Sequence, residues 1–286
     1  MEERNERGET LKEFLARYDE TKYRRPSNTV DMILLTVLKG KLKVLLVKRK
    51  DHPFIHDWAM PGGFVNFDED LDAAMKRELE EETNLFDSTY FRQLYTFGNA
   101  DRDPRTRVIT TVYLSMTPAE NIKMTSAGDD AMDTGWFTIQ KITMTTDGHE
   151  RKSILMLDEE EKGIHLRYEI YDTACDNYVQ TRSKLLESSN AKLAADHIKA
   201  INMAIDVVRN RAASTGIMFN LLPKECTLRE IQEVYEAIVN HPVDTGNFRR
   251  DIKKMLVATG NTTIVNGRKV ATYSFNPLLP FVKETL

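Results

Sequence analysis

The feature of this sequence that most constrains its fold is a helix, predicted over Asp70–Thr83, with β-rich segments on both sides. The helical segment lacks Gly and Pro, and its apolar residues recur at helical spacing (Leu71, Ala74, Met75 and Leu79). Two β-rich segments precede the helix, and the turn Lys39-Gly40-Lys41 between them predicts an antiparallel hairpin. A mixed α/β layered fold is therefore favoured, with strands predicted at Val30–Leu38, Lys43–Val47, Phe91–Phe97, Arg107–Met116 and Thr134–Phe137.

Length and composition bound the class of protein. The chain has 286 residues, 41% of them hydrophobic, which is enough for one large domain or two ordinary ones. Its formal net charge of −4 does not suggest a protein that coats nucleic acid or binds a membrane surface. Cys175 and Cys226 have no metal-ligand or disulfide spacing, and the charged N-terminus has no signal-peptide core. Because the apolar runs are also too short to span a bilayer, we expect a cytoplasmic protein with no membrane partner.

Three glutamates of the predicted helix share one face. At about 100° per residue, Glu78, Glu81 and Glu82 fall within an arc of about 100°, whereas Glu80 points to the opposite side. Divalent cations neutralise such a cluster, and carboxylate oxygens suit Mg²⁺ or Mn²⁺. A metal held there can bridge a pyrophosphate and activate an attacking water. The alternative is a solvated acidic helix face.

The neighbouring residues fit the metal-site interpretation. Gly62 and Gly63 allow a sharp turn before the helix, and a carbonyl oxygen of that turn can reach the same metal. Arg77 precedes Glu78 and can hold a carboxylate in place by a charge-assisted hydrogen bond.

These residues resemble the signature of the Nudix hydrolase family, G-x(5)-E-x(7)-R-E-U-x-E-E-x-G-U, in which U is apolar. Asn84 stands where the family has Gly, at a helix end where a left-handed conformation is expected and Asn is the next-best residue. The resemblance implies that Glu78, Glu81, Glu82 and Gly63 hold the metal, with Arg77 and Glu69 in support. The matching positions are Gly63, Glu69, Arg77, Glu78, Leu79, Glu81, Glu82 and Leu85.

A wider resemblance covers most of the chain. It is similar to a subfamily that fuses a Nudix domain to a C-terminal winged helix and includes ADP-ribose pyrophosphatases and Nudix-related transcriptional regulators of NAD metabolism. The resemblance implies a Nudix α/β/α sandwich with a mixed sheet, followed by a small winged helix-turn-helix domain, and ADP-ribose or a related nucleoside diphosphate derivative as ligand. It is carried by WAMPGGFV, FGNADRDPRTRVITTVYL, AGDDAMDTGWF, DHIKAINMAI and FNLLPKECTLREIQEVYEAI.

Ligand-binding candidates also lie outside the signature, each with a plainer alternative. Three arginines flank a predicted strand and can meet phosphates, or they form a solvated basic loop. Asp129 and Asp130 lie in a Gly-containing loop where one can deprotonate water, although such pairs often serve as turn residues. Trp58 and Phe64 flank the Pro-Gly-Gly turn and can stack on an adenine, or pack in the core. The arginines are Arg102, Arg105 and Arg107.

Beyond a further predicted hairpin and a long helix, the sequence changes character at about residue 217. Ser153–Leu157 and Leu166–Tyr171 predict a hairpin, and residues 191–211 predict a long helix that ends before Gly216. A helix follows at Leu228, Ile231, Tyr235 and Ile238, and a second at Phe248, Ile252 and Leu256. A tight Asn266-Gly267 hairpin turn comes next. This order is that of a winged helix, so we expect a Nudix domain over residues 1–212 and a winged-helix domain over 217–286.

The winged-helix segment carries concentrated positive charge. Residues 247–270 contain six positive side chains against Asp251, in a chain that is negative overall. The predicted DNA contacts are Asn247, Arg249, Arg250, Lys253, Lys254, Arg268 and Lys269.

Two hypotheses are compatible with the whole pattern. In the first, the chain is an ADP-ribose-responsive transcriptional regulator that binds duplex DNA as a homodimer and can retain hydrolase activity. In the second, it is an ADP-ribose pyrophosphatase whose winged helix serves dimerisation or substrate positioning. The basic residues favour the first hypothesis, and the intact glutamates favour the second.

Overall fold

The structure, a computed structural model, describes residues 2–83, 90–122, 131–176 and 178–278. Most of the strands form one large mixed sheet in the order β10-β9-β8-β7-β2-β1-β6-β5, in which β3 also pairs with β2 and β4 with β1. β1 and β6 run parallel, whereas the other pairs are antiparallel. The strands are β1 (Ser27–Leu38), β2 (Lys41–Arg49), β3 (Trp58–Ala59), β4 (Gly62–Phe64), β5 (Tyr90–Phe97), β6 (Val108–Met116), β7 (Ala131–Asp147), β8 (Glu150–Glu159), β9 (Ile164–Cys175) and β10 (Tyr178–Leu185).

Helices cover both faces of this sheet. Because side chains of a strand alternate between its faces, Met32 and Leu34 of β1 pack towards α2 (Leu71–Thr83), whereas Ile33 and Leu35 lie in the cluster that α3 (His197–Ala212) covers. The alternation places α2 on one face and α3 on the other, which confirms the expected α/β/α sandwich. α2 contributes Ala74, Met75 and Leu79, and α3 contributes Ile198, Ile201, Ile205 and Val208.

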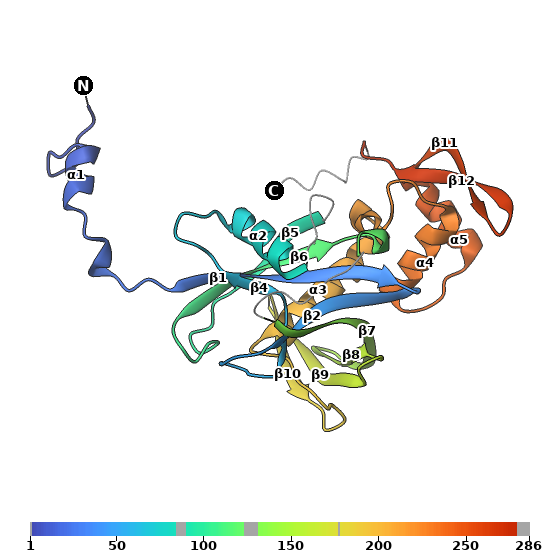
Figure 1. The fold of residues 1–286 in the computed structure, drawn as a ribbon, viewed down its shortest axis with the longest axis horizontal. Helices are drawn as coiled ribbons and strands as arrows, with labels where there is room; N and C mark the ends of the chain where they lie inside the picture. Colours follow the sequence, from blue (N-terminus) through green and yellow to red (C-terminus); the bar gives the residue numbers. More distant parts are fainter. Residues whose placement is uncertain (1, 84–89, 123–130, 177, 279–286) are drawn as a thin grey trace.

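The C-terminal elements have the winged-helix order. η3 (Gly216–Leu221) leads to α4 (Leu228–Val239), α5 (Thr245–Ile252) and η4 (Lys253–Met255), and the hairpin of β11 (Leu256–Val265) and β12 (Arg268–Phe275) follows. In Figure 1 these elements gather at the opposite end of the molecule from α1 (Leu11–Arg17), which stands apart from the body. Two short 3₁₀ turns complete the list, η1 (Glu20–Lys22) and η2 (Ala119–Asn121).

Several element boundaries differ from the sequence prediction, and β7 in particular is much longer than the predicted strand Thr134–Phe137. Leu256 begins β11 instead of lying in the second helix of the winged helix. The long helix starts at His197, not at residue 191, because the preceding backbone forms a bridge between Leu193 and Trp58 of β3. The hairpin predicted around residues 153–171 is confirmed as the β8–β9 pair.

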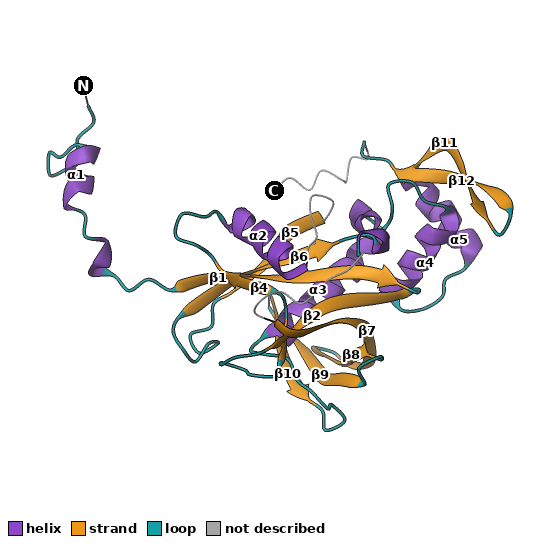
Figure 2. Cartoon of the chain, in the orientation of Figure 1, coloured by secondary structure: helices purple, strands orange, loops and turns teal. Residues whose placement is uncertain are grey.

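The sheet and the winged helix share one buried core. The largest hydrophobic cluster runs from Ile33 in β1 through Ile201 in α3 to Ile231 in α4 and Ile252 in α5. The division into domains at residues 212–217 therefore stays a prediction. Figure 2 shows the strands of the sheet in orange and the helices in purple. Within the described ranges, no helix is both long enough and apolar enough to cross a membrane.

Candidate functional site

The site is built around a turn, residues Met60–Gly63, that we call the glycine turn. Its last two residues belong to β4, which pairs with Val30 and Asp31 of β1. A Cβ atom on Gly63 would lie 2.1 Å from the Oε1 atom of Glu78, so only glycine leaves room for that carboxylate. Glu78, the glutamate that follows Arg77 in the signature, thus lies directly against the backbone of the turn.

Arg77 holds the signature carboxylates together. Its guanidinium donates to both oxygens of Glu69, at 2.8 and 2.9 Å, and to Glu78 Oε1 at 2.7 Å. It also reaches Glu81 at 3.2 Å and the carbonyl oxygen of Phe64 at 3.1 Å. The supporting role expected for Arg77 and Glu69 therefore corresponds to an observed network that ties α2 to the turn.

The glutamates of the network have different electrostatic environments. Hydrogen bonds from Arg77 lower the pKa of Glu69 to about 2. Burial raises the pKa of Glu78, against the opposing effect of Arg77. Of these two carboxylates, Glu78 is the one whose negative charge the protein stabilises less, and a nearby cation would offset the cost of its burial.

The expected face of three carboxylates is only partly assembled. Glu78 is buried, Glu82 is half-buried and Glu81 is exposed, and Glu80 is exposed as well. Within the described part of the chain, no three acidic, histidine or cysteine side chains lie close enough to form a preassembled metal site. Arg77 lies between Glu78 and Glu81 and supplies the countercharge there. Asn84 and Leu85 lie outside the described residues.

The ligand-binding candidates outside the signature lie in different parts of the structure. Arg105 lies over the ring of Phe64, 5.5 Å from its centroid, and Phe64 is 47% exposed, so these two side chains border the glycine turn together. Arg107 is exposed on the neighbouring loop. Asp129 and Asp130 lie outside the described residues.

Two of the candidates lie away from a ligand, and Trp58 takes the core position that was its alternative. Trp58 is 1% exposed and packs edge-on against Phe137 in the core, so it cannot stack on a ligand. The side chain of Arg102 is also buried and pairs with Asp196 at 2.8 Å, which corrects its placement in an open basic loop. The burial of Trp58 follows from its position on β3 in the middle of the molecule.

Two polar residues near the turn were missed by the sequence prediction. Asp31 faces Gly62 and accepts a hydrogen bond from Thr110 at 2.5 Å. His197 accepts the backbone N–H of Met60 at its Nδ1 atom, at 2.9 Å. A charged residue within the apolar run of β1 marks Asp31 in the sequence, whereas no local pattern marks His197.

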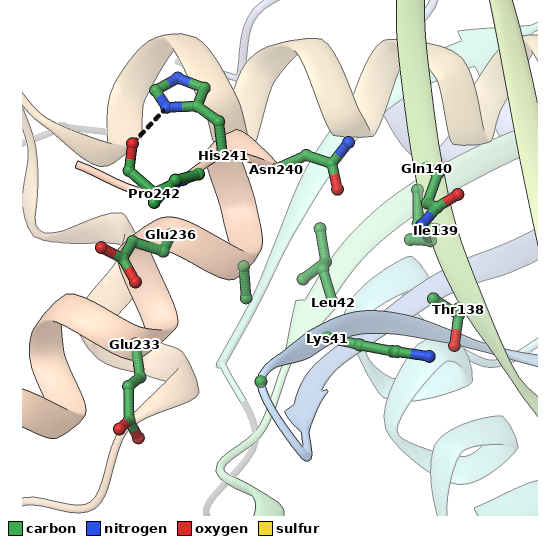
Figure 3. Close-up of a pocket in the computed structure, with 12 residues that line it drawn as sticks. Lys41, Leu42, Thr138, Ile139, Gln140, Glu233, Glu236, Asn240, His241 and Pro242 are labelled. Atoms are coloured by element: carbon green, nitrogen blue, oxygen red, sulfur yellow. Dashed lines mark hydrogen bonds between the residues drawn. The ribbon is translucent and has the colours of Figure 1, made fainter.

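A separate cleft lies between the sheet and the winged helix. It has a volume of about 330 Å³ and is bordered by the β1–β2 turn, β7 and the end of α4 (Figure 3). Lys41 and Gln140 approach it from the sheet, and Glu236 and His241 from the winged helix. None of the signature residues lines this cleft. The candidate site is therefore the glycine turn, where Arg77 joins Glu69 and Glu78 to the backbone, and not the cleft.

The predicted DNA-contacting residues form a second candidate site, which we call the basic cluster. All seven are exposed. Asn247, Arg249 and Arg250 lie on α5, Lys253 and Lys254 on η4, and Arg268 and Lys269 at the start of β12. Arg250 makes a surface ion pair with Asp251 at 3.3 Å, which water and salt weaken.

Family models match both parts of the chain. Residues 26–157 match the NUDIX domain, and residues 218–275 match the NrtR DNA-binding winged helix domain. The chain is also 34% identical over 143 residues to the ADP-ribose pyrophosphatase of Methanocaldococcus jannaschii, covering 49% of this chain and 80% of that protein. The chain belongs to the Nudix family, and its second domain is an NrtR-type winged helix.

Two relatives share the complete architecture. The ADPR responsive transcriptional repressor NtrR of Acinetobacter baylyi is 28% identical over 266 residues, which is 92% of this chain and 87% of that protein. The crystal structure of Shewanella oneidensis NrtR complexed with a 27mer DNA superposes with a TM-score of 0.60 at 26% identity, covering 87% of this chain and 93% of that one.

The contact between Gly63 and Glu78 predicts that a side chain at residue 63 weakens metal binding. Gly63→Ala should displace the Glu78 carboxylate and weaken Mn²⁺ binding by about 10-fold or more, measured by titration calorimetry. Gly98→Ala is the matched control, because the nearest atom to its added Cβ lies 3.9 Å away. Equal Mn²⁺ affinities of the two variants would contradict the placement of the metal against Gly63.

Proposed function

We propose that this protein is an ADP-ribose-responsive transcriptional regulator of NAD or ribose metabolism. The observation that carries the proposal is the exposed basic cluster, which lies on a winged helix that shares a buried core with the sheet, in a chain whose Nudix signature retains its glutamates. The full-length relatives with this architecture include an ADPR responsive repressor and a protein crystallised with DNA, which supports the proposal.

The ligand is expected at the glycine turn. A pyrophosphate bridged by a divalent cation would lie beside Glu78, Glu81 and Glu82, with Phe64 and Arg105 at the border of the site. The carboxylate oxygens and a glycine carbonyl are hard donors, so they fit Mg²⁺ or Mn²⁺. The position of Glu78 against Gly63 supports this assignment, because it brings the carboxylate into contact with the backbone of the turn.

A second candidate function is hydrolysis of ADP-ribose. The glutamates of the signature are all present, and the archaeal relative is an ADP-ribose pyrophosphatase. When bound, the metal would supply the activation of water, while Arg77 keeps Glu78 and Glu69 in place. Regulation and hydrolysis are compatible in one molecule.

The assembly is proposed to be a homodimer in the cytoplasm. A winged helix that reads a palindrome needs two copies, and each copy would place α5 in the major groove and the β11–β12 wing along the backbone. The boundary between the two domains is proposed at residues 212–217, where α3 ends and η3 begins.

The enzymatic proposal predicts unequal effects of two neighbouring glutamates. Glu82→Gln should lower the Mg²⁺-dependent conversion of ADP-ribose to AMP and ribose 5-phosphate by about 100-fold or more, because the metal loses a charged ligand. Glu80→Gln should change it little, because Glu80 points away from the turn. Product chromatography measures both rates.

The outcome separates the two functions. Equal loss in both variants would contradict the assigned helix face. If the wild-type protein hydrolyses no nucleoside diphosphate derivative, the hydrolase proposal fails, and binding of ADP-ribose remains to be measured by calorimetry.

The DNA proposal predicts different effects of two basic residues. Lys253→Ala should weaken binding to every duplex and reduce the salt dependence by about one log–log unit, because one phosphate contact is lost. Arg250→Ala should relax the preference at one base pair, by about 1–3 kcal/mol if it reads a guanine edge. Fluorescence anisotropy over a range of salt concentrations measures both effects.

A distant arginine provides the control. Arg182 of β10 is 65% exposed and lies outside the winged helix, so Arg182→Ala should leave DNA affinity unchanged. If the wild-type protein shows no salt-sensitive binding to the region upstream of its own gene, the regulator proposal is wrong.

A further inference from the structure

Three elements each place one titratable side chain against the glycine turn. Glu78 of α2 lies against Gly63, and Asp31 of β1 lies against Gly62. His197, the first residue of α3, accepts the N–H of Met60. The turn is therefore in contact with the helix that carries the signature and also with the helix that leads to the winged helix.

The contact with α3 requires one particular form of His197. The side chain is buried, and its Nδ1 atom accepts a hydrogen bond, so that nitrogen carries no proton. Burial lowers the pKa of His197; Asp31 and Asp196 act in the opposite direction, and Arg102 and Arg49 act with burial. The neutral imidazole is a rigid link between the turn and the first turn of α3.

We propose that His197 transmits the state of the glycine turn to α3, and through α3 to the winged helix. This inference rests on the proposed function, because it assigns the residue through which ligand binding regulates DNA binding.

Further contacts fix the start of α3 to the same region. The side chain of Asp196, the residue before the helix, pairs with Arg102 at 2.8 Å. The backbone N–H of Trp58 donates to Lys192 at 2.9 Å, and that of Ala194 donates to the carbonyl oxygen of Trp58 at 2.8 Å. The start of α3 therefore follows the backbone that leads into the glycine turn.

The far end of α3 is attached to the winged helix. Arg209 donates from Nε to the carbonyl oxygen of Ile238 in the last turn of α4, at 2.9 Å, and from Nη1 to that of Lys141 in β7, at 3.1 Å. Asp206 pairs with the buried Lys141 at 2.6 Å. Because 16 helical residues span about 24 Å, α3 joins the two sites as one rigid element.

The turn leaves little room for independent movement. A Cβ on Gly62 would lie 2.2 Å from the carbonyl oxygen of Val30, and one on Gly63 would lie 2.1 Å from Glu78. A ligand or metal that repositions the Glu78 carboxylate therefore changes the packing directly against the backbone of the turn. Closely packed elements respond to such shifts by changing between discrete arrangements, which lets a small local shift reach the winged helix.

Two substitutions at His197 test the inference. Asn in His197→Asn retains a side-chain oxygen near the position of Nδ1, whereas Leu in His197→Leu fills the space without an acceptor. The quantity measured is the ratio of DNA affinities with and without saturating ADP-ribose, in the full chain, by fluorescence anisotropy. Saturation separates a loss of coupling from a loss of ligand affinity.

The expected ratios differ between the variants. A wild-type ratio of about 5 to 150 is typical of coupled sites. We expect His197→Leu to reduce this ratio of DNA affinities to less than about 2. In His197→Asn, the logarithm of the ratio should remain at least about half of its wild-type value. Circular dichroism and urea unfolding establish that both variants are folded.

The remaining outcomes are decisive as well. If folded His197→Leu keeps the same ratio as the wild-type protein, or if both folded variants lose the ratio equally, the role of His197 is overturned and the proposed function stands. If the ratio measured for the wild-type protein is one, the proposed regulation and this inference are overturned together. If His197→Leu does not fold, hydrogen exchange of the wild-type protein decides: unchanged exchange at Met60 and along α3 on adding ADP-ribose overturns the inference.

Discussion

The contact between the Glu78 carboxylate and the backbone of Gly63 is the constraint on which the candidate ligand site depends. A buried carboxylate is costly without a positive partner, and Arg77 supplies that partner from the neighbouring position while it also holds Glu69. The glycine is needed because any Cβ would occupy the space of the carboxylate. In this chain the Nudix signature thus also sets the packing of α2 against the glycine turn.

The position of the turn inside the fold gives this local contact a wider consequence. The glycine turn lies at the junction of β1, α2 and α3, and α3 continues to the winged helix within one buried core. Beside this shared core, the cleft of Figure 3 separates the end of α4 from the β1–β2 turn.

The fold and the signature were largely predictable from the sequence, because both depend on local patterns. The spacing of apolar residues predicted α2, and the Asn266-Gly267 turn predicted the β11–β12 hairpin. The start of α3 was placed six residues early, because pairing between Leu193 and Trp58 is a contact between distant segments. Burial of Trp58, the pair of Arg102 with Asp196 and the bond of His197 to Met60 depend on tertiary packing, which no local pattern reports.

The most direct test of the central claim, that the two sites are coupled, is a reciprocal titration of the wild-type protein. DNA affinity is measured with and without saturating ADP-ribose, and ADP-ribose affinity is measured with and without saturating DNA. Linkage requires the same factor in both directions, and we expect it to lie well away from one. A factor of one in both titrations would show that the Nudix domain and the winged helix bind their ligands independently, and would contradict the claim.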